Sequence, residues 1–234
     1  MWPTVADPEF WVGLLKIIWI NVVLSGDNAV VIAMAARSLR PDEQRRAIAW
    51  GSGFAVLLRI ALTVVAVQLM ALPMLQIVGG LLLLWIGTQL LAVEEETEEE
   101  AKTHHSLYAA IRTILIADLV MSLDNVIGVA AAAKGNLLLL SIGLGLSIPL
   151  VVFGSSLMIQ LMTRFPIVIS VGAALIGWVA GETLISDALV VNWIAPITWL
   201  HWAVPITCAL LVVTSGRWLA WLFPKPAHTD IEPG

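Results

Sequence analysis

The sequence predicts an all-α membrane protein with seven transmembrane helices. Three observations indicate this class: the composition, the length of the apolar segments and the absence of alternating hydrophobicity. Hydrophobic residues make up 59% of the 234 residues and charged residues 12%, whereas soluble domains carry about 45–50% and about 25%. This composition excludes an ordinary soluble fold and intrinsic disorder, which needs low hydrophobicity. The net charge of −5 offers no basic surface for nucleic acid.

Seven apolar segments are long enough to cross a bilayer as helices, which takes about 20 residues at a rise of about 1.5 Å each. They are residues 10–36, 47–70, 73–92, 107–133, 137–162, 166–187 and 196–215. None has the alternating pattern of a transmembrane β-strand. The alternative that the first segment is a cleaved signal peptide is disfavoured, because Asp7 and Glu9 precede it and no basic residue comes before Lys16.

The basic residues predict that the N-terminus lies outside and the C-terminus inside, because Lys and Arg concentrate in cytoplasmic loops. In this orientation the outer loops hold Lys134 alone. The inner side holds Arg37, Arg40, Arg45, Arg46, Lys102, Arg112, Arg164, Arg217 and Lys225. The excess of basic residues on one side therefore predicts an N-terminus outside and a C-terminus inside.

An internal repeat relates the two halves of the chain. Residues 24–30 (LSGDNAV) match residues 121–127 (MSLDNVI), and at the same offset Asn21 matches Asp118. Chance agreement is unlikely because the matches continue at polar, Gly, Pro and Trp positions through three consecutive spans. The further pairs are Gly51 with Gly143, Gly53 with Gly145, Pro73 with Pro166, Gly79 with Gly172, Trp85 with Trp178 and Gln89 with Glu182.

Each repeat contains an odd number of spans, so the second repeat must cross the membrane in the opposite sense. The predicted organisation is a 3+3 inverted repeat followed by one extra helix. Its parts are a first repeat at 10–92, an acidic cytoplasmic linker at 93–106, a second repeat at 107–187, a seventh helix at 196–215 and a cytoplasmic tail at 216–234. Inverted repeats build many secondary transporters, whose substrate site lies near the bilayer midplane.

Acidic residues inside the apolar segments are the candidate functional groups. A charge at the centre of a transmembrane helix costs roughly 2.5–3.5 kcal/mol on insertion scales, so these acids must be partnered, protonated or in contact with water. Their carboxylate and amide oxygens suit Mn²⁺, Mg²⁺ or Ca²⁺ better than copper or zinc. The predicted metal ligands are Asp27, Asn28, Asp118, Asp124, Asn125 and Glu182, with Asn21 and Gln89 in support.

A shared site for Asn21 and Asp27 would require a helix break in the first span. Asn21 lies six residues before Asp27, so the two side chains leave an ideal helix on different faces. A local break would bring them together, and Gly26 permits one. Leu123 stands at the matching position of the second repeat, so we expect the distortion to be unequal.

Arg59 lies in the middle of the second span and has no basic match in the second repeat. We expect it to pair with one of the intramembrane acids. Because crowded carboxylates titrate as a coupled group, we also hypothesise that metal binding displaces protons and that metal export is coupled to proton entry.

The segment 94–105 (EEETEEEAKTHH) has two open interpretations. It is a solvated connector, as like-charge runs usually are, or a low-affinity cation collector, because His-rich tracts bind metals. The sequence contains no phosphate-binding loop and no hydrolytic or redox constellation, so we expect neither an enzyme nor an organic cofactor.

Three motifs resemble those of the TerC family of integral membrane proteins, which are grouped with LysE-like exporters. They are residues 25–30 (SGDNAV), 121–127 (MSLDNVI) and 79–87 (GGLLLLWIG), within a resemblance that covers about residues 10–215. It implies a seven-span bacterial inner-membrane protein associated with Mn²⁺ export and, historically, with tellurite resistance. At matching positions it implies metal-site roles for Asp27, Asn28, Asp118, Asp124 and Asn125, and less directly for Glu182. Many relatives carry an acid where this chain has Asn21.

The leading hypothesis is therefore a divalent-cation exporter with Mn²⁺ as the transported substrate. One alternative is export of another small cation or an amino acid. A second is a non-transporting subunit that supplies metal at a membrane protein complex. The expected partners are the lipid bilayer, the divalent cation, and a second copy of the chain or the secretion machinery.

Overall fold

The computed structural model describes residues 8–24, 26–70, 72, 74–92, 107–133 and 136–222. Every regular element within these residues is a helix, and they contain no strand, so the predicted all-α class is confirmed. The helices are α1 (Pro8–Leu24), α2 (Gly26–Ala36), α3 (Pro41–Met70), α4 (Leu75–Ala92), α6 (Leu107–Ala133), α7 (Leu137–Arg164), α8 (Ile167–Ile185), α9 (Val191–Ile194) and α10 (Leu200–Leu222).

Five of these helices are long and apolar enough to cross a membrane, namely α3, α4, α7, α8 and α10. The bent pair of α1 and α2 makes a sixth span if both helices belong to one crossing. The predicted crossing at 107–133 coincides with α6, but α6 is not among these six spans. A multi-span helical protein is thus confirmed, whereas the seventh crossing and the orientation of the termini stay predictions.

The predicted break in the first span is present. Helix α1 ends at Leu24 and α2 begins at Gly26, and the chain direction turns by 50° between them. In contrast, α6 runs unbroken through Asp118 and Asp124. The expectation of an unequal distortion is therefore confirmed.

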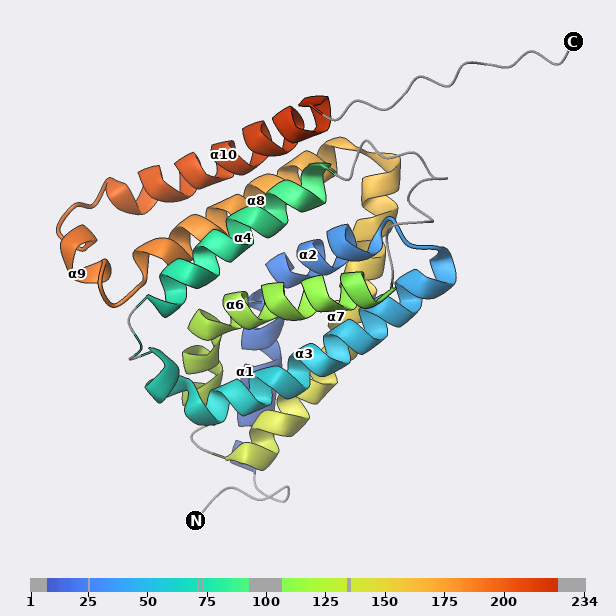
Figure 1. The fold of residues 1–234 in the computed structure, drawn as a ribbon. Coiled ribbons are helices and arrows are strands. Elements are labelled where there is room, and N and C mark those ends of the chain that lie inside the picture. The colour runs from blue at the N-terminus through green and yellow to red at the C-terminus, as the bar shows by residue number, and fades with distance from the viewer. Residues whose placement is uncertain are drawn as a thin grey trace, which may run out of the picture.

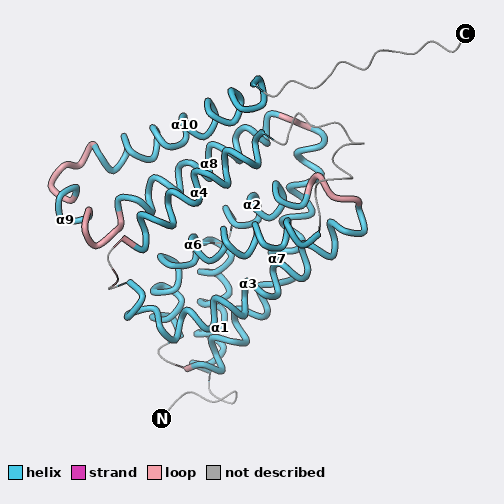
Figure 2. Tube along the Cα trace, in the orientation of Figure 1, coloured by secondary structure: helices cyan, strands magenta, loops and turns pink. Residues whose placement is uncertain are grey.

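The helices form two packed groups. Helices α4, α8 and α10 lie side by side in one layer (Figure 1) and contact one another along their lengths. In the other group, α3 packs along α6, while α1 and α2 both pack against α7. The short helix α9 lies within the connection between α8 and α10 (Figure 2). Helix α2 contacts members of both groups, including α6, α7 and α8.

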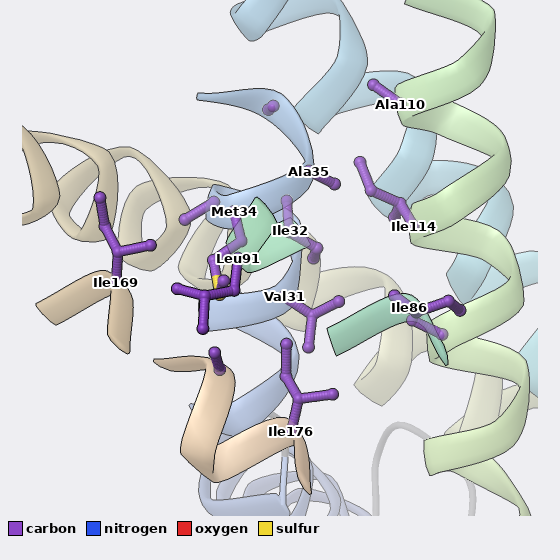
Figure 3. Close-up of a cluster of buried hydrophobic side chains, with 14 of the residues drawn as sticks. Val31, Ile32, Met34, Ala35, Ile86, Leu91, Ala110, Ile114, Ile169 and Ile176 are labelled. Carbon is purple, nitrogen blue, oxygen red and sulfur yellow. The ribbon is translucent and has the colours of Figure 1, made fainter. Parts of the chain in front are cut away.

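Helix α2 contacts helices of both groups, and its C-terminal part is apolar on every side. Its residues from Val31 to Ala36 are all buried, which is the pattern of a helix surrounded by others. Figure 3 shows Val31 and Ile32 of α2 among side chains from neighbouring helices, including Ile86 of α4 and Ile114 of α6. This packing positions the N-terminal end of α2, which carries Asp27 and Asn28.

Glycines allow α8 to lie directly against α10. A Cβ atom at Gly181 would stand 2.5 Å from the Cα of Pro205, and one at Gly177 would stand 2.7 Å from the Cα of Ala209. Both neighbours are backbone atoms, which cannot move aside as a side chain could. Small residues of this kind let helix backbones approach closely in membrane proteins.

We expect Gly181→Ala to lower the stability of the protein by about 1–3 kcal/mol, the usual cost of overpacking. The matched control is Gly145→Ala, because a Cβ atom at Gly145 meets nothing within 4 Å. That substitution should raise stability by about 0.5–1 kcal/mol, because alanine favours a helix more than glycine does. Thermal unfolding in detergent measures both changes. A destabilisation shared by both variants would contradict the close contact.

Asp187 lies just after α8 and fixes the start of α4. The sequence places it at the end of the predicted span 166–187, but the structure ends α8 at Ile185 and leaves Asp187 only 1% exposed. Its Oδ2 accepts hydrogen bonds from the backbone N–H groups of Gln76 at 3.2 Å and Ile77 at 3.4 Å. Its Oδ1 accepts from Met74 at 3.3 Å and Leu189 at 3.0 Å. The carboxylate thus satisfies free donors at the N-terminus of a helix.

Burial alone would raise the pKa of Asp187, but the backbone N–H donors outweigh burial and hold its pKa below the ordinary value of 3.8. Its contribution to stability is therefore full above the unfolded-state pKa and is lost as the pH falls through the lower folded-state pKa. We expect Asp187→Asn to cost about 0.5–2 kcal/mol at pH 7, as loss of a helix cap does. Thermal unfolding from pH 7 to pH 3 tests this, and equal acid sensitivity of the two proteins would refute it.

Candidate cation site

A cavity of about 20 Å³ with both polar and apolar lining residues lies between the two Asp-Asn helices and the helices that pack on them. This volume exceeds the roughly 10–15 Å³ needed to hold one water molecule, and so it suits a single small occupant. Five helices contribute to its wall: α1, α2, α3, α6 and α7. The lining residues are Asn21, Asn28, Ile32, Ser52, Ala55, Val56, Arg59, Asp118, Ile148 and Val151.

Arg59 holds the polar side of the cavity together. It projects from α3 and is only 3% exposed. Its Nε donates to the Oγ of Ser122 at 2.9 Å, and its two terminal nitrogens donate to the Oδ1 of Asn21 at 2.5 Å and the Oδ1 of Asp118 at 2.5 Å. The predicted pairing of Arg59 with an intramembrane acid is therefore confirmed, and the acid is Asp118.

The carboxylate of Asp118 is engaged at both oxygens. Oδ1 accepts from Arg59, and Oδ2 accepts from the Oγ of Ser122 at 3.1 Å. The ion pair is buried, with 4% of the Arg59 side chain and 7% of the Asp118 side chain exposed. Burying two charges is tolerable only with such complete hydrogen bonding, because each charge loses its water.

Two further residues at the cavity wall carry polar atoms without partners among the described residues. The Oδ1 and Nδ2 of Asn28 and the Oγ of Ser52 are buried, and each residue is only 3% exposed. Such groups are rare, because an unsatisfied buried polar group costs about 1–3 kcal/mol. Because they lie at the wall of a cavity, these polar atoms are available to an occupant of that cavity.

The structure brings together only part of the predicted ligand set. Asn21, Asn28 and Asp118 line the cavity. Asp27 is half-buried at the start of α2, where its Oδ1 accepts from the backbone N–H of Asn28 at 2.8 Å. It lies close enough to Arg59 and Asp118 to interact with both charges.

Asn125, Glu182 and Gln89 are not among the described residues that line the cavity. Asn125 is half-buried on α6 and has polar contacts of its own. The side chain of Glu182 is exposed on α8, and that of its match, Gln89, is exposed on α4. Asp124 lies in α6, but its side chain is outside those that the structure describes, so its role stays a prediction.

The described side chains include no group of three or more His, Cys, Asp and Glu residues that could hold a metal ion. The oxygens at the cavity therefore come mainly from amides and a hydroxyl, with Asp118 as the carboxylate that lines it. Oxygen ligands of this kind suit hard cations. The acidic segment 94–105 and residues 223–234 lie outside the described residues, so the predicted linker and the end of the tail are untested.

Sequence reasoning missed two serines of this site. Ser52 contributes an unpartnered hydroxyl to the cavity, and Ser122 binds both members of the ion pair. Each had a signal in the sequence. Ser52 stands between Gly51 and Gly53, which belong to the repeat, and Ser122 follows Asp118 by one helical turn.

Sequence comparisons with known proteins identify the family of the chain. The sequence profile described as "Integral membrane protein TerC family" matches residues 6–221. The chain is 46% identical to "Uncharacterized membrane protein YjbE" of Bacillus subtilis over 182 residues, which cover 77% of this chain and 83% of that protein.

More distant relatives carry the same region within longer proteins. The chain is 29% identical to a UPF0053 protein of Buchnera aphidicola and 30% identical to the UPF0053 inner membrane protein YoaE of Escherichia coli. These alignments cover 64% and 52% of this chain, but the chain spans only 32% and 27% of those relatives. No solved structure matches the chain significantly.

Proposed function

Because the chain belongs to the integral membrane protein TerC family, we propose that it is a secondary transporter that exports a divalent cation, with Mn²⁺ as its leading substrate. The protein resides in the lipid bilayer, since the family is integral to the membrane and the chain contains several apolar helices. We place it in the bacterial inner membrane with the N-terminus outside. The direction of transport follows from the family resemblance.

The observation that carries the proposal is the pair of unpartnered polar side chains at the cavity. Asn28 and Ser52 present oxygen atoms that have no hydrogen-bond partner among the described residues, and Asp118 supplies a negative charge at the same cavity. Asn28 belongs to the first Asp-Asn motif, and Asp118 lies six residues before Asp124 of the second. Amide, hydroxyl and carboxylate oxygens at one cavity suit a hard divalent cation.

The packing of the helices supports the proposed inverted repeat. Gly51 of α3 packs against Ile114 of α6, and its match Gly143 of α7 packs against Ile17 of α1. Ile17 and Ile114 stand at the same offset as the two Asp-Asn motifs. The contact between the second span of one repeat and the first span of the other thus occurs twice, once in each direction, as a two-fold relation between the halves requires.

The cavity lies where the proposed repeats meet. Asn21 and Asp118 are matched positions, and both accept a hydrogen bond from Arg59. A site at the interface between inverted repeats is the arrangement found in many secondary transporters. We therefore propose that the two halves alternate around this cavity to open it to each side of the membrane.

The amino-acid alternative has less support in the geometry. A substrate carboxylate needs a cationic partner, and Arg59 is the basic residue that lines the cavity. Its guanidinium is already committed to Ser122, Asn21 and Asp118. The alternative of a metal-supplying subunit without transport predicts that the cavity residues can be changed without loss of function, so the same variants test it.

We test the proposal with the variant Asn28→Leu in proteoliposomes. Leucine has a branched shape like that of asparagine, and its additional volume can enter the cavity. We expect Mn²⁺ uptake by the wild type and loss of uptake in the variant. Stability should not fall by more than about 1 kcal/mol, because the change removes unsatisfied polar atoms. A fluorescent Mn²⁺ reporter inside the vesicles measures uptake, and a pH dye records whether protons move in exchange.

The matched control is Asn192→Leu, which makes the same change at an exposed residue of α9. This variant should transport Mn²⁺ like the wild type. A folded wild type that carries no Mn²⁺ would refute the proposed substrate. Equal transport by the wild type and Asn28→Leu would show that the cavity is not the site.

A further inference from the structure

Arg59 is a feature of the cavity that a simple cation site does not require. A positive charge inside a cation site opposes the binding of the substrate, yet the guanidinium is buried and fully engaged there. The register that matches Gly51 with Gly143 matches Arg59 with Val151, and both residues line the cavity. The charge is therefore present in one half only, and it is not a by-product of the duplication.

The arginine and a metal ion compete for the same carboxylate. Among the described side chains, Asp118 is the acid that lines the cavity, and its Oδ1 accepts a hydrogen bond from Arg59. A divalent cation coordinated by that oxygen would lie within a few ångströms of the guanidinium, where two positive charges repel strongly in a medium of low dielectric constant. Metal binding through Asp118 therefore requires Arg59 to withdraw.

Resting on the proposed function, we infer that Arg59 is a tethered counter-cation: it occupies Asp118 when the transported metal is absent and is displaced when the metal binds. The device has two consequences. It lowers the affinity for the metal, so that the ion can be released. It also neutralises Asp118 in the empty protein, which avoids carrying an uncompensated buried carboxylate through the conformational change. Arg59 thus allows the transporter without bound metal to reset, that is, to return to the conformation that binds the next ion.

Metal binding to the purified full-length protein gives the first test. Isothermal titration calorimetry with Mn²⁺ compares the wild type, Arg59→Gln and Arg59→Lys. Arg59→Gln removes the competing charge, so we expect Mn²⁺ to bind about tenfold more tightly or better, a change of 1.4 kcal/mol or more. Arg59→Lys keeps a positive charge but cannot reproduce the planar fork of three hydrogen bonds, so its affinity should lie between the other two.

Transport assays give a second test. Loss of a purely structural arginine would reduce net uptake and exchange alike, whereas loss of the proposed counter-cation would reduce net uptake alone. In proteoliposomes, net Mn²⁺ uptake needs the empty protein to reset, whereas exchange of labelled for unlabelled Mn²⁺ does not. We expect Arg59→Gln to lose most net uptake while it retains exchange. Arg59→Lys should restore part of the net uptake, because it restores the charge.

The failure of this inference is distinguishable from failure of the proposed function. If the wild type neither binds nor transports Mn²⁺, the proposed function fails and the inference fails with it. If the wild type transports Mn²⁺ but Arg59→Gln binds it more weakly, Arg59 is a structural or binding element, and the inference alone is overturned. An equal loss of net uptake and exchange overturns it as well.

A second variant keeps the inference falsifiable if Arg59→Gln does not fold. Ser122→Ala removes the acceptor of the Arg59 Nε and the donor to Asp118 Oδ2, which loosens the hold on the guanidinium. We expect Mn²⁺ to bind a few-fold more tightly. The control is Ser155→Ala, which is equally buried but donates only to the Val151 carbonyl of its own helix, and it should leave Mn²⁺ affinity unchanged. Unchanged or weaker Mn²⁺ binding in Ser122→Ala overturns the inference.

Discussion

Asp118→Asn is expected to reduce Mn²⁺ transport to the level of protein-free vesicles. The substitution keeps the size of the side chain and an acceptor oxygen for Arg59, but it removes the negative charge that lines the cavity. It also leaves the guanidinium of Arg59 uncompensated beside the cavity, where it repels an entering cation. Both effects weaken the binding of Mn²⁺. Uptake of Mn²⁺ into reconstituted vesicles and calorimetric titration of Mn²⁺ measure the loss.

Asp42→Asn makes the same chemical change at an exposed residue in the first turn of α3. Because Asp42 is exposed to solvent and is not among the residues that line the cavity, we expect wild-type transport. Circular dichroism and gel filtration establish that both variants are folded. Mn²⁺ transport by a folded Asp118→Asn at half the wild-type rate or more would exclude Asp118 as an essential group of the site.

The helices could be predicted well because the requirement of the bilayer is simple. An apolar run of about 20 residues is needed to cross it, and the structure has helices at each predicted segment. The break next to Gly26 could also be predicted, since glycine tolerates irregular backbone. Helix ends were less accurate: α3 begins at Pro41, before the predicted residue 47, and α10 extends to Leu222. At the start of α3 the additional residues are polar and continue the helix beyond the apolar run.

The sequence could not predict in the same way which side of each helix points into the protein and which points outward. Lipid tails are as apolar as a protein interior, so a transmembrane helix need not carry a polar face that marks its outside. Glu182 illustrates this: it is polar and lies in an apolar helix, yet the packing of α8 on α4 and α10 leaves its side chain exposed. The composition of α8 alone could not distinguish this placement from an inward one.

Contacts between segments that are distant in the sequence could be predicted only in part. The sequence predicts that Arg59 needs an acidic partner, because a lone charge in the membrane is costly. It does not say which acid, since the choice of Asp118 depends on the packing of α3 along α6. The unpartnered state of Asn28 is also invisible in sequence, because it is a property of every neighbour around that side chain.

The buried ion pair predicts the largest effect on stability. Arg59→Met leaves the carboxylate of Asp118 buried without its cation, and removal of one partner from such a pair costs about 3–5 kcal/mol. The double variant Arg59→Met with Asp118→Asn removes both charges and should recover part of this loss. We expect a coupling energy at the upper end of the range of about 0.5–3 kcal/mol for directly contacting residues. Titration with SDS in mixed micelles measures the free energy of unfolding of all four proteins.

The surface pair of Arg40 and Glu43 provides the matched cycle. Their charged atoms lie 3.7 Å apart, and 68% and 32% of the two side chains are exposed. Water and salt screen such a pair, so Arg40→Met with Glu43→Gln should give a coupling energy of about 0–1 kcal/mol. A coupling at Arg59 and Asp118 no larger than this would mean that the two charges do not depend on each other. The guanidinium would then be no effective substitute for a metal ion at Asp118, and the competition between them would lose its physical basis.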